Sequence, residues 1–180
     1  TLALLLALLP NTVVAGPEVG SQAVEHSGVR GGLIVHLGSA SGSTTASLRV
    51  NERYLVHGLA ADPVTVEAAR REIVRLCQDG PVSVYQTDGH RLPYAENVVN
   101  LLVVETTASV RAEEIQRILA PLGCAMLPDT PAFRNVAGNL DSLGFTSEER
   151  SGWLACRKPW PDDIDEWSHW LHGPDGNPVA

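Results

Sequence analysis

The sequence predicts an α/β protein, a three-layer Rossmann-like sandwich around a mainly parallel seven-stranded sheet. From Gly31 onward, short apolar runs alternate with helical patterns, as in chains built from βαβ units. The runs at 33–37 and 98–104 are apolar along nearly their whole length, which is typical of strands covered on both faces. Two final strand-like segments flank Arg150-Ser151-Gly152 and predict a C-terminal antiparallel hairpin.

The individual elements follow from periodicity and from residues that start or stop helices. The helix predicted at 62–78 begins at Asp62-Pro63, because Asp is a good N-cap and Pro suits the first helical turn. Asp79-Gly80-Pro81 ends it. The other predicted helices cover 43–50, 111–119 and 131–143, and the predicted strands cover 33–37, 54–59, 82–86, 98–104, 124–127, 145–148 and 153–157.

Composition limits the classes of function. The 180 residues suit one domain, and 44% hydrophobic with 19% charged residues exclude a mainly disordered chain. A net charge of −8 with scattered basic residues predicts no nucleic-acid partner. The three cysteines, Cys77, Cys124 and Cys156, are far apart and form no CxxC, so we expect buried apolar side chains and no metal site.

The N-terminus has the pattern of a targeting segment. Residues 1–9 form an apolar run that ends at Pro10, and Val13-Val14-Ala15 resembles a small-residue cleavage site, so 1–15 is predicted to be a partial secretory signal peptide. The alternative is a buried N-terminal helix. The run is too short for a stable membrane span. We therefore expect an exported protein, with 16–30 as a linker or one short helix. We also expect the sequence to be a fragment, since it lacks an initiator Met and ends soon after a turn-rich segment.

A candidate ligand site follows the first predicted strand. In open parallel sheets, ligands bind outside the carboxyl ends of the strands, near the first β–α turn. Here that turn is His36-Leu37-Gly38-Ser39-Ala40-Ser41-Gly42-Ser43. Gly38 and Gly42 would permit a tight turn and close approach of a ligand to the backbone, although such a glycine pair alone is weak evidence.

Four segments in succession carry a resemblance to a known family. They are LIVHLGSASGS at 33–43, TDGHRLPYAENVVNLLVV at 87–104, the helix, Pro-Leu-Gly turn and strand at 114–126, and LDSLGF at 140–145. In this order they resemble the motifs of class I S-adenosylmethionine (SAM)-dependent methyltransferases, over residues 31–157. The resemblance implies SAM as the cofactor. The cofactor-binding residues that it implies are Gly38, Ser39, Ala40, Gly42, Asp62, Asp88 and Gly89.

Several positions depart from the family's pattern. Ala40 stands where the middle glycine of the first motif is usual, and Ala60 where an acid should grip both ribose hydroxyls. Losing two charge-assisted hydrogen bonds, about 1.5–3 kcal/mol each, would weaken cofactor binding by roughly two orders of magnitude or more. Asp62 could substitute, but the N-cap role is favoured. Asn100 and Pro121-Leu122-Gly123 replace a common Asp and Pro-Gly-Gly. Asp88 keeps the family's adenine-contacting place, or is simply an Asp-Gly turn residue.

Other polar residues near the expected crevice are weaker candidates for a functional role. Glu105 ends the fourth predicted strand and is a candidate general base, although a solvated strand-end Glu is the favoured interpretation. His36 and His57 lie on neighbouring predicted strands and are expected to be core or rim histidines. His90 is the histidine expected to face the pocket.

The segment 158–180 is rich in tryptophan and is expected to pack on a neighbour. It contains Trp160, Trp167 and Trp170, while a metal cluster at His169 and His172 is the less favoured interpretation. The segment resembles the junction in exported planctomycete-type proteins that carry a methyltransferase-like domain ahead of a quinoprotein-like β-propeller. We therefore expect a further domain after Ala180.

The sequence is compatible with three functions. The favoured one is a degenerate, non-catalytic methyltransferase-like domain that serves as an interaction or scaffold module of a larger exported protein. The second is an active SAM-dependent methyltransferase acting on a small molecule. The third, an NAD-type oxidoreductase, is least favoured, because it lacks the same ribose-binding acid and does not explain the closing hairpin.

Overall fold

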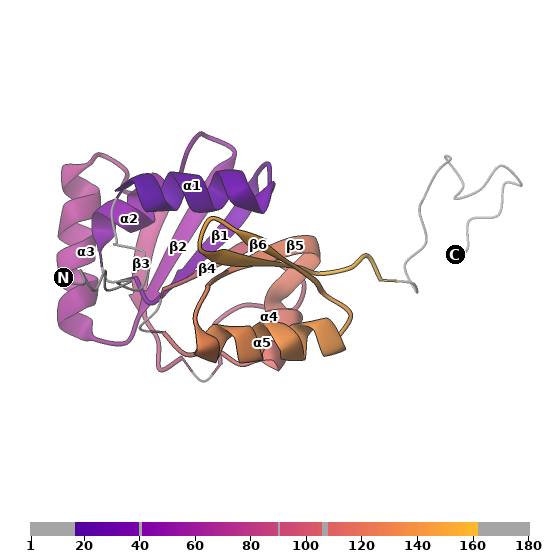
Figure 1. Ribbon diagram of the computed structural model, residues 1–180. Coiled ribbons are helices and arrows are strands. Elements are labelled where there is room, and N and C mark those ends of the chain that lie inside the picture. The colour runs from indigo at the N-terminus through magenta and orange to yellow at the C-terminus, as the bar shows by residue number, and fades with distance from the viewer. Residues whose placement is uncertain (1–16, 40, 90, 106–107, 162–180) are drawn as a thin grey trace, which may run out of the picture.

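The computed structural model describes residues 17–39, 41–89, 91–105 and 108–161. A seven-stranded sheet lies between two layers of helices (Figure 1). Strands β1 to β5 pair in parallel, and β7 pairs antiparallel with both of its neighbours, β5 and β6. The predicted fold class is therefore confirmed.

The sheet has the strand order β3-β2-β1-β4-β5-β7-β6. The order reverses between β1 and β4, so the carboxyl ends of these two strands and of β2 meet at the edge where a crevice is expected. The strands are β1 (Gly32–Leu37), β2 (Tyr54–Ala60), β3 (Val82–Gln86), β4 (Val99–Val104), β5 (Leu119–Pro128), β6 (Thr146–Arg150) and β7 (Trp153–Arg157).

Alternate residues of the central strands supply two separate cores. On β1, Ile34 faces the helices α1 (Pro17–Ser27), α2 (Gly42–Ser47) and α3 (Pro63–Arg75). Its neighbour Val35 faces α4 (Ala112–Ile118) and α5 (Pro131–Ser142) on the opposite side. Successive residues point to opposite faces of the sheet, and both faces are buried. The strand is therefore apolar along nearly its whole length.

Helix α1 changes the interpretation of the N-terminal region. Between the two alternatives for residues 16–30, the structure has the short helix and not a linker. Ala23 and Val24 are buried in the core beneath α1. At its last residue, Arg157 donates to the Ser27 carbonyl, and just beyond the helix the Tyr54 hydroxyl donates to the Val29 carbonyl. Burial of an apolar helix face keeps this segment on the sheet, so the folded domain begins before residue 31.

Strand β5 also begins earlier than predicted. The sequence predicts a helix to residue 119, a turn at Pro121-Leu122-Gly123 and a strand from Cys124. Instead Leu119 already pairs with Val99, and the register then shifts before Leu101 pairs with Cys124. Leu122 has φ of +61°, and a Cβ on Gly123 would lie 2.8 Å from the Ala120 carbonyl oxygen. An irregular strand start thus occupies the predicted turn.

Strand β6 forms one edge of the sheet and is exposed along its whole length. Its residues TSEER are polar, and charged side chains on an edge strand oppose pairing with other chains. Its partner β7 is buried, which agrees with the predicted C-terminal hairpin.

Some further predictions can be compared with the described residues. Cys124 and Cys156 are buried as expected, but Cys77 is exposed just after α3 with φ of +54°, which corrects that prediction. Within the described part of the chain, no helix is long and apolar enough to cross a membrane, and no three His, Cys, Asp or Glu side chains group as metal ligands. The signal segment 1–15 and most of the Trp-rich segment 158–180 lie outside the described residues.

Candidate functional site

The turn after β1 requires a glycine at Gly38. Its φ is +86°, in the left-handed region that favours glycine. A Cβ at this position would lie 2.9 Å from Ala108 Cβ and 3.1 Å from Glu105 Cβ. The amides of Gly38 and Ser39 donate to the Leu59 carbonyl at 2.9 and 3.0 Å. The turn is therefore held against the end of β2, and both amides already have an acceptor.

A crevice opens between this turn and the carboxyl ends of β2 and β3. We call it the Gly38–Asp88 crevice; its volume is about 310 Å³. Five of the predicted cofactor residues line it. These are Gly38, Ser39, Asp62, Asp88 and Gly89.

The end of β2 lacks the acid that the family's pattern would place there. Ala60 is the last residue of β2, lines the crevice and has no polar side-chain atom. Asp62 lies two residues further, and its Oδ2 accepts from the Thr65 amide at 2.8 Å and the Thr65 hydroxyl at 2.7 Å. These hydrogen bonds hold the pKa of Asp62 below its usual value. The predicted N-cap role is confirmed, and one carboxylate oxygen is engaged by the helix.

Gly42 and Ala40 differ from the five lining residues. Gly42 begins α2, and a Cβ there would lie 2.5 Å from the Ala69 carbonyl oxygen and 2.9 Å from Glu72 Cβ. Glycine at this position therefore allows α2 to approach α3 closely, and Gly42 is not among the residues that line the crevice. Ala40 and His90 lie outside the described residues.

An ion pair on α4 binds the backbone of the segment that follows Asp88. Glu114 Oε1 accepts from the Leu92 amide at 2.6 Å and from Arg117 at 2.7 Å. Arg117 also donates to the carbonyls of Leu92 and Tyr94, at 3.0 and 2.6 Å. The loop that follows the crevice is thus tied to the second helical layer.

Asn100 and His57 have structural contacts away from the crevice. Asn100 Oδ1 accepts from the Leu33 amide at 2.9 Å, joining β4 to the start of β1. His57 lies on the face opposite His36, where its Nδ1 is 2.6 Å from the Tyr94 hydroxyl. Burial lowers the pKa of His57.

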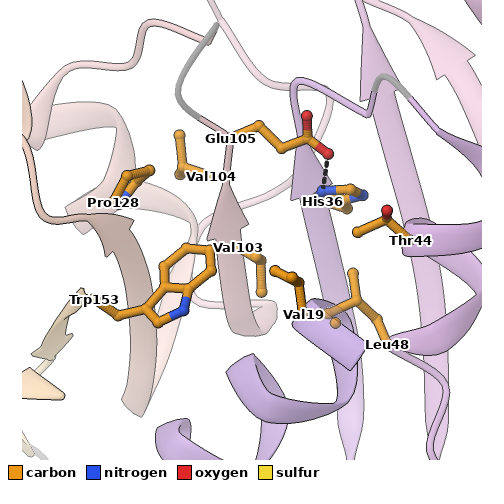
Figure 2. A pocket seen from close by; sticks show the side chains of 10 residues that line it. Val19, His36, Thr44, Leu48, Val103, Val104, Glu105, Pro128 and Trp153 are labelled. Carbon is orange, nitrogen blue, oxygen red and sulfur yellow. Dashed lines mark ion pairs between the residues drawn. The ribbon is translucent and has the colours of Figure 1, made fainter. Parts of the chain in front are cut away.

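Glu105 belongs to a second, smaller cavity beside the crevice. Figure 2 shows its carboxylate against His36, with Thr44 next to the ring. His36 Nε2 lies 3.0 Å from Glu105 Oε1, within ion-pair distance. The N–H is not aligned with this oxygen, which accepts no hydrogen bond from a described residue. We call this space, about 70 Å³, the His36–Glu105 cavity.

A chain of hydroxyl groups connects the two spaces. Thr45 Oγ1 lies 2.9 Å from His36 Nδ1 and 2.6 Å from the hydroxyl of Ser39, which lines the crevice. The prediction that His36 is a core histidine agrees with its 1% exposure. The sequence analysis missed Thr44, Thr45 and Trp153. A Thr-Thr pair in a short helix of small residues was the available signal, but only the fold brings it against His36.

Comparisons with known proteins identify the fold. No protein-family model matches the sequence, and no curated protein sequence does either. Among solved structures, a protein assigned as an SAM-dependent methyltransferase from Methanococcus maripaludis has a TM-score of 0.65 at 17% identity, over 82% of this chain and 87% of that one.

Two further structures are similar over comparable lengths. An SAM-dependent methyltransferase from Aquifex aeolicus has a TM-score of 0.65 at 16% identity, over 78% of this chain and 88% of that one. The [4+2]-cyclase SpnF has a TM-score of 0.64 at 13% identity, over 81% and 82%. At such identities the likeness establishes the fold alone: this chain has the α/β fold of the SAM-dependent methyltransferases.

Proposed function

We propose that the chain is a methyltransferase-like domain that has lost tight SAM binding and serves as an interaction module of a larger exported protein. The observation that carries this proposal is Ala60 at the end of β2, where a methyl group lines the Gly38–Asp88 crevice in place of a carboxylate. Losing two charge-assisted hydrogen bonds to the ribose corresponds to roughly a hundredfold or greater loss of affinity.

The neighbouring acid does not restore the missing contact fully. Asp62 lines the crevice, but its Oδ2 accepts two hydrogen bonds from Thr65. Turning this oxygen toward a ribose would leave the first turn of α3 without its cap. The residues present therefore fit the cofactor poorly at the ribose.

An active SAM-dependent methyltransferase remains the second candidate. Its support is that Gly38, Asp88 and Gly89 line one crevice. Methyl transfer to a good nucleophile depends mainly on proximity and alignment, so it needs no elaborate set of catalytic side chains.

Calorimetric titration with SAM and S-adenosylhomocysteine separates the two candidates. We expect no measurable heat from the unaltered domain below millimolar ligand. The variant Ala60→Asp places a carboxylate where the family has one, and we expect its affinity to rise roughly tenfold or more. Ala61→Asp is the matched control, since it adds the same charge one residue further along. Micromolar binding by the unaltered domain would contradict the proposal and favour the enzyme.

A further inference from the structure

The His36–Glu105 cavity contains two buried oxygen atoms with no aligned hydrogen-bond partner among the described residues, although one of them is within ion-pair distance of His36. Glu105 Oε1 and Thr44 Oγ1 are both buried and accept or donate no hydrogen bond among the described residues. Thr44 is 4% exposed. Buried polar atoms are almost always satisfied in folded proteins, so two such atoms lining one cavity indicate a site for a polar ligand.

The charge of the cavity determines which polar group suits it. Glu105 is its acid, and the imidazole of His36 at 3.0 Å is poorly aligned to serve the Oε1 atom. An anion would be repelled by the carboxylate. An ammonium group has three N–H donors and no acceptor, so it can supply donors to both orphan oxygens.

The other walls are apolar. Figure 2 shows the Trp153 indole extending from β7 toward Val103 on β4, with Val19 and Leu48 below Val103. Trp153 and Leu48 are themselves buried. This surface suits short alkyl groups, and an indole adds attraction for a cation within about 6 Å of the ring.

The size limits the ligand to a few atoms. The volume is about 70 Å³, whereas a cavity of about 150 Å³ accepts benzene. We propose that the His36–Glu105 cavity is a binding site for a small primary alkylammonium of one to three carbons. This inference goes beyond the proposed function and does not require SAM in the neighbouring crevice.

The site is tested by titrating the domain with ethylammonium, and with ethanol and acetate as neutral and anionic counterparts, at constant ionic strength. Binding is followed by the NMR shift of the Trp153 indole N–H, assigned with Trp153→Phe. A ligand this small cannot bind tightly, so we expect millimolar affinity. We expect ethanol to bind at least about tenfold more weakly, and acetate not to bind.

Substitutions of the cavity residues test whether ethylammonium binds at this site. Glu105→Gln keeps the shape but removes the charge, and we expect at least about a tenfold loss of ethylammonium affinity. Thr44→Val should weaken binding severalfold. Glu149→Gln, an exposed carboxylate change on β6, is the control and should have no effect.

Three results would overturn the proposal. They are equal binding of ethanol and ethylammonium, unchanged affinity in Glu105→Gln, and no saturable shift up to about 100 mM probe, since the cavity would then hold only water. If circular dichroism shows that Glu105→Gln is unfolded, the ethanol comparison and Thr44→Val decide. None of these results depends on SAM titration, so this inference and the proposed function can fail separately.

Discussion

Glu114 and Arg117, one turn apart on α4, show how a single ion pair can hold a loop. Their side chains are only 10% and 16% exposed, and together they bind the backbone of Leu92 and Tyr94. A partly buried ion pair of this kind adds little to the stability of the fold compared with an apolar replacement. Removing one partner, however, leaves the other as an unpaired, partly buried charge. The loop beside the Gly38–Asp88 crevice therefore depends on both residues.

We expect Arg117→Met to lower the free energy of unfolding by about 3 kcal/mol at pH 7. The substitution leaves the Glu114 carboxylate and two carbonyls without their donor. Chemical denaturation measures the change. Arg134→Met is the control, because Arg134 is half-exposed and pairs with Asp129 and Glu149 at the surface. Equal losses in the two variants would contradict this account.

The same pair predicts a pH dependence. Hydrogen bonds from Arg117 hold the pKa of the Glu114 carboxyl below its usual 4.5. Because the folded pKa is lower than the unfolded one, the stabilisation is complete above about pH 4.5 and is lost as pH falls through the folded value. Denaturation between pH 3 and 7 should show this fall, and Glu114→Gln should reduce it.

At the scale of elements, helices α1 and α2 pack closely against each other. A Cβ on Gly20 would lie 2.1 Å from Ser47 Oγ and 2.9 Å from the Thr44 carbonyl oxygen. The serine hydroxyl can turn aside, but the carbonyl belongs to the helix backbone and cannot. Gly20 thus sets the distance between the two helices and also lines the His36–Glu105 cavity.

We expect Gly20→Ala to destabilise the domain by about 1–3 kcal/mol through overpacking. Gly138→Ala is the matched control, since Gly138 lies in α5 and nothing is within 4 Å of its added Cβ. There, higher helix propensity should stabilise by about 0.5–1 kcal/mol. Thermal unfolding of the two variants should move in opposite directions. A stabilising Gly20→Ala would show that α1 is not held against α2.

At the scale of the whole molecule, the signal-peptide hypothesis leaves the described domain intact. Cleavage after Ala15 would fall two residues before Pro17, where α1 begins. The mature chain would then retain the helix that covers β4, β5 and β7.

We expect residues 1–30, placed behind a start codon and a short basic segment, to export a fused reporter and to be cleaved after Ala15. The reason is that a short apolar core followed by small residues matches a signal sequence. Mass spectrometry of the exported reporter should give Gly16 as its first residue. Ala15→Arg is the control that should block cleavage. A reporter retained uncut in the cytosol would favour a buried N-terminal helix instead.

Much of the fold could be predicted because its signals are local. The limits of β3, the N-cap at Asp62 and the hairpin around Gly152 each follow from neighbouring residues. The start of β5 could not, because pairing of Leu119 with Val99 overrides the turn signal of Pro121 and Gly123. For the candidate site, the sequence placed Gly38, Gly42 and Asp88 near strand ends. In the structure Gly38 and Asp88 line the crevice, whereas Gly42 packs against α3.

By itself the sequence determined the order and type of the elements, since the two-residue and 3.6-residue periods are properties of consecutive residues. Only the tertiary structure decided whether residues 17–27 are a linker or a packed helix, because burying one face of α1 depends on strands about 80 to 140 residues away in the chain. It also decided that His36, Thr44 and Glu105 line one cavity. Contacts between distant segments arise only when the sheet brings β1 and β4 side by side.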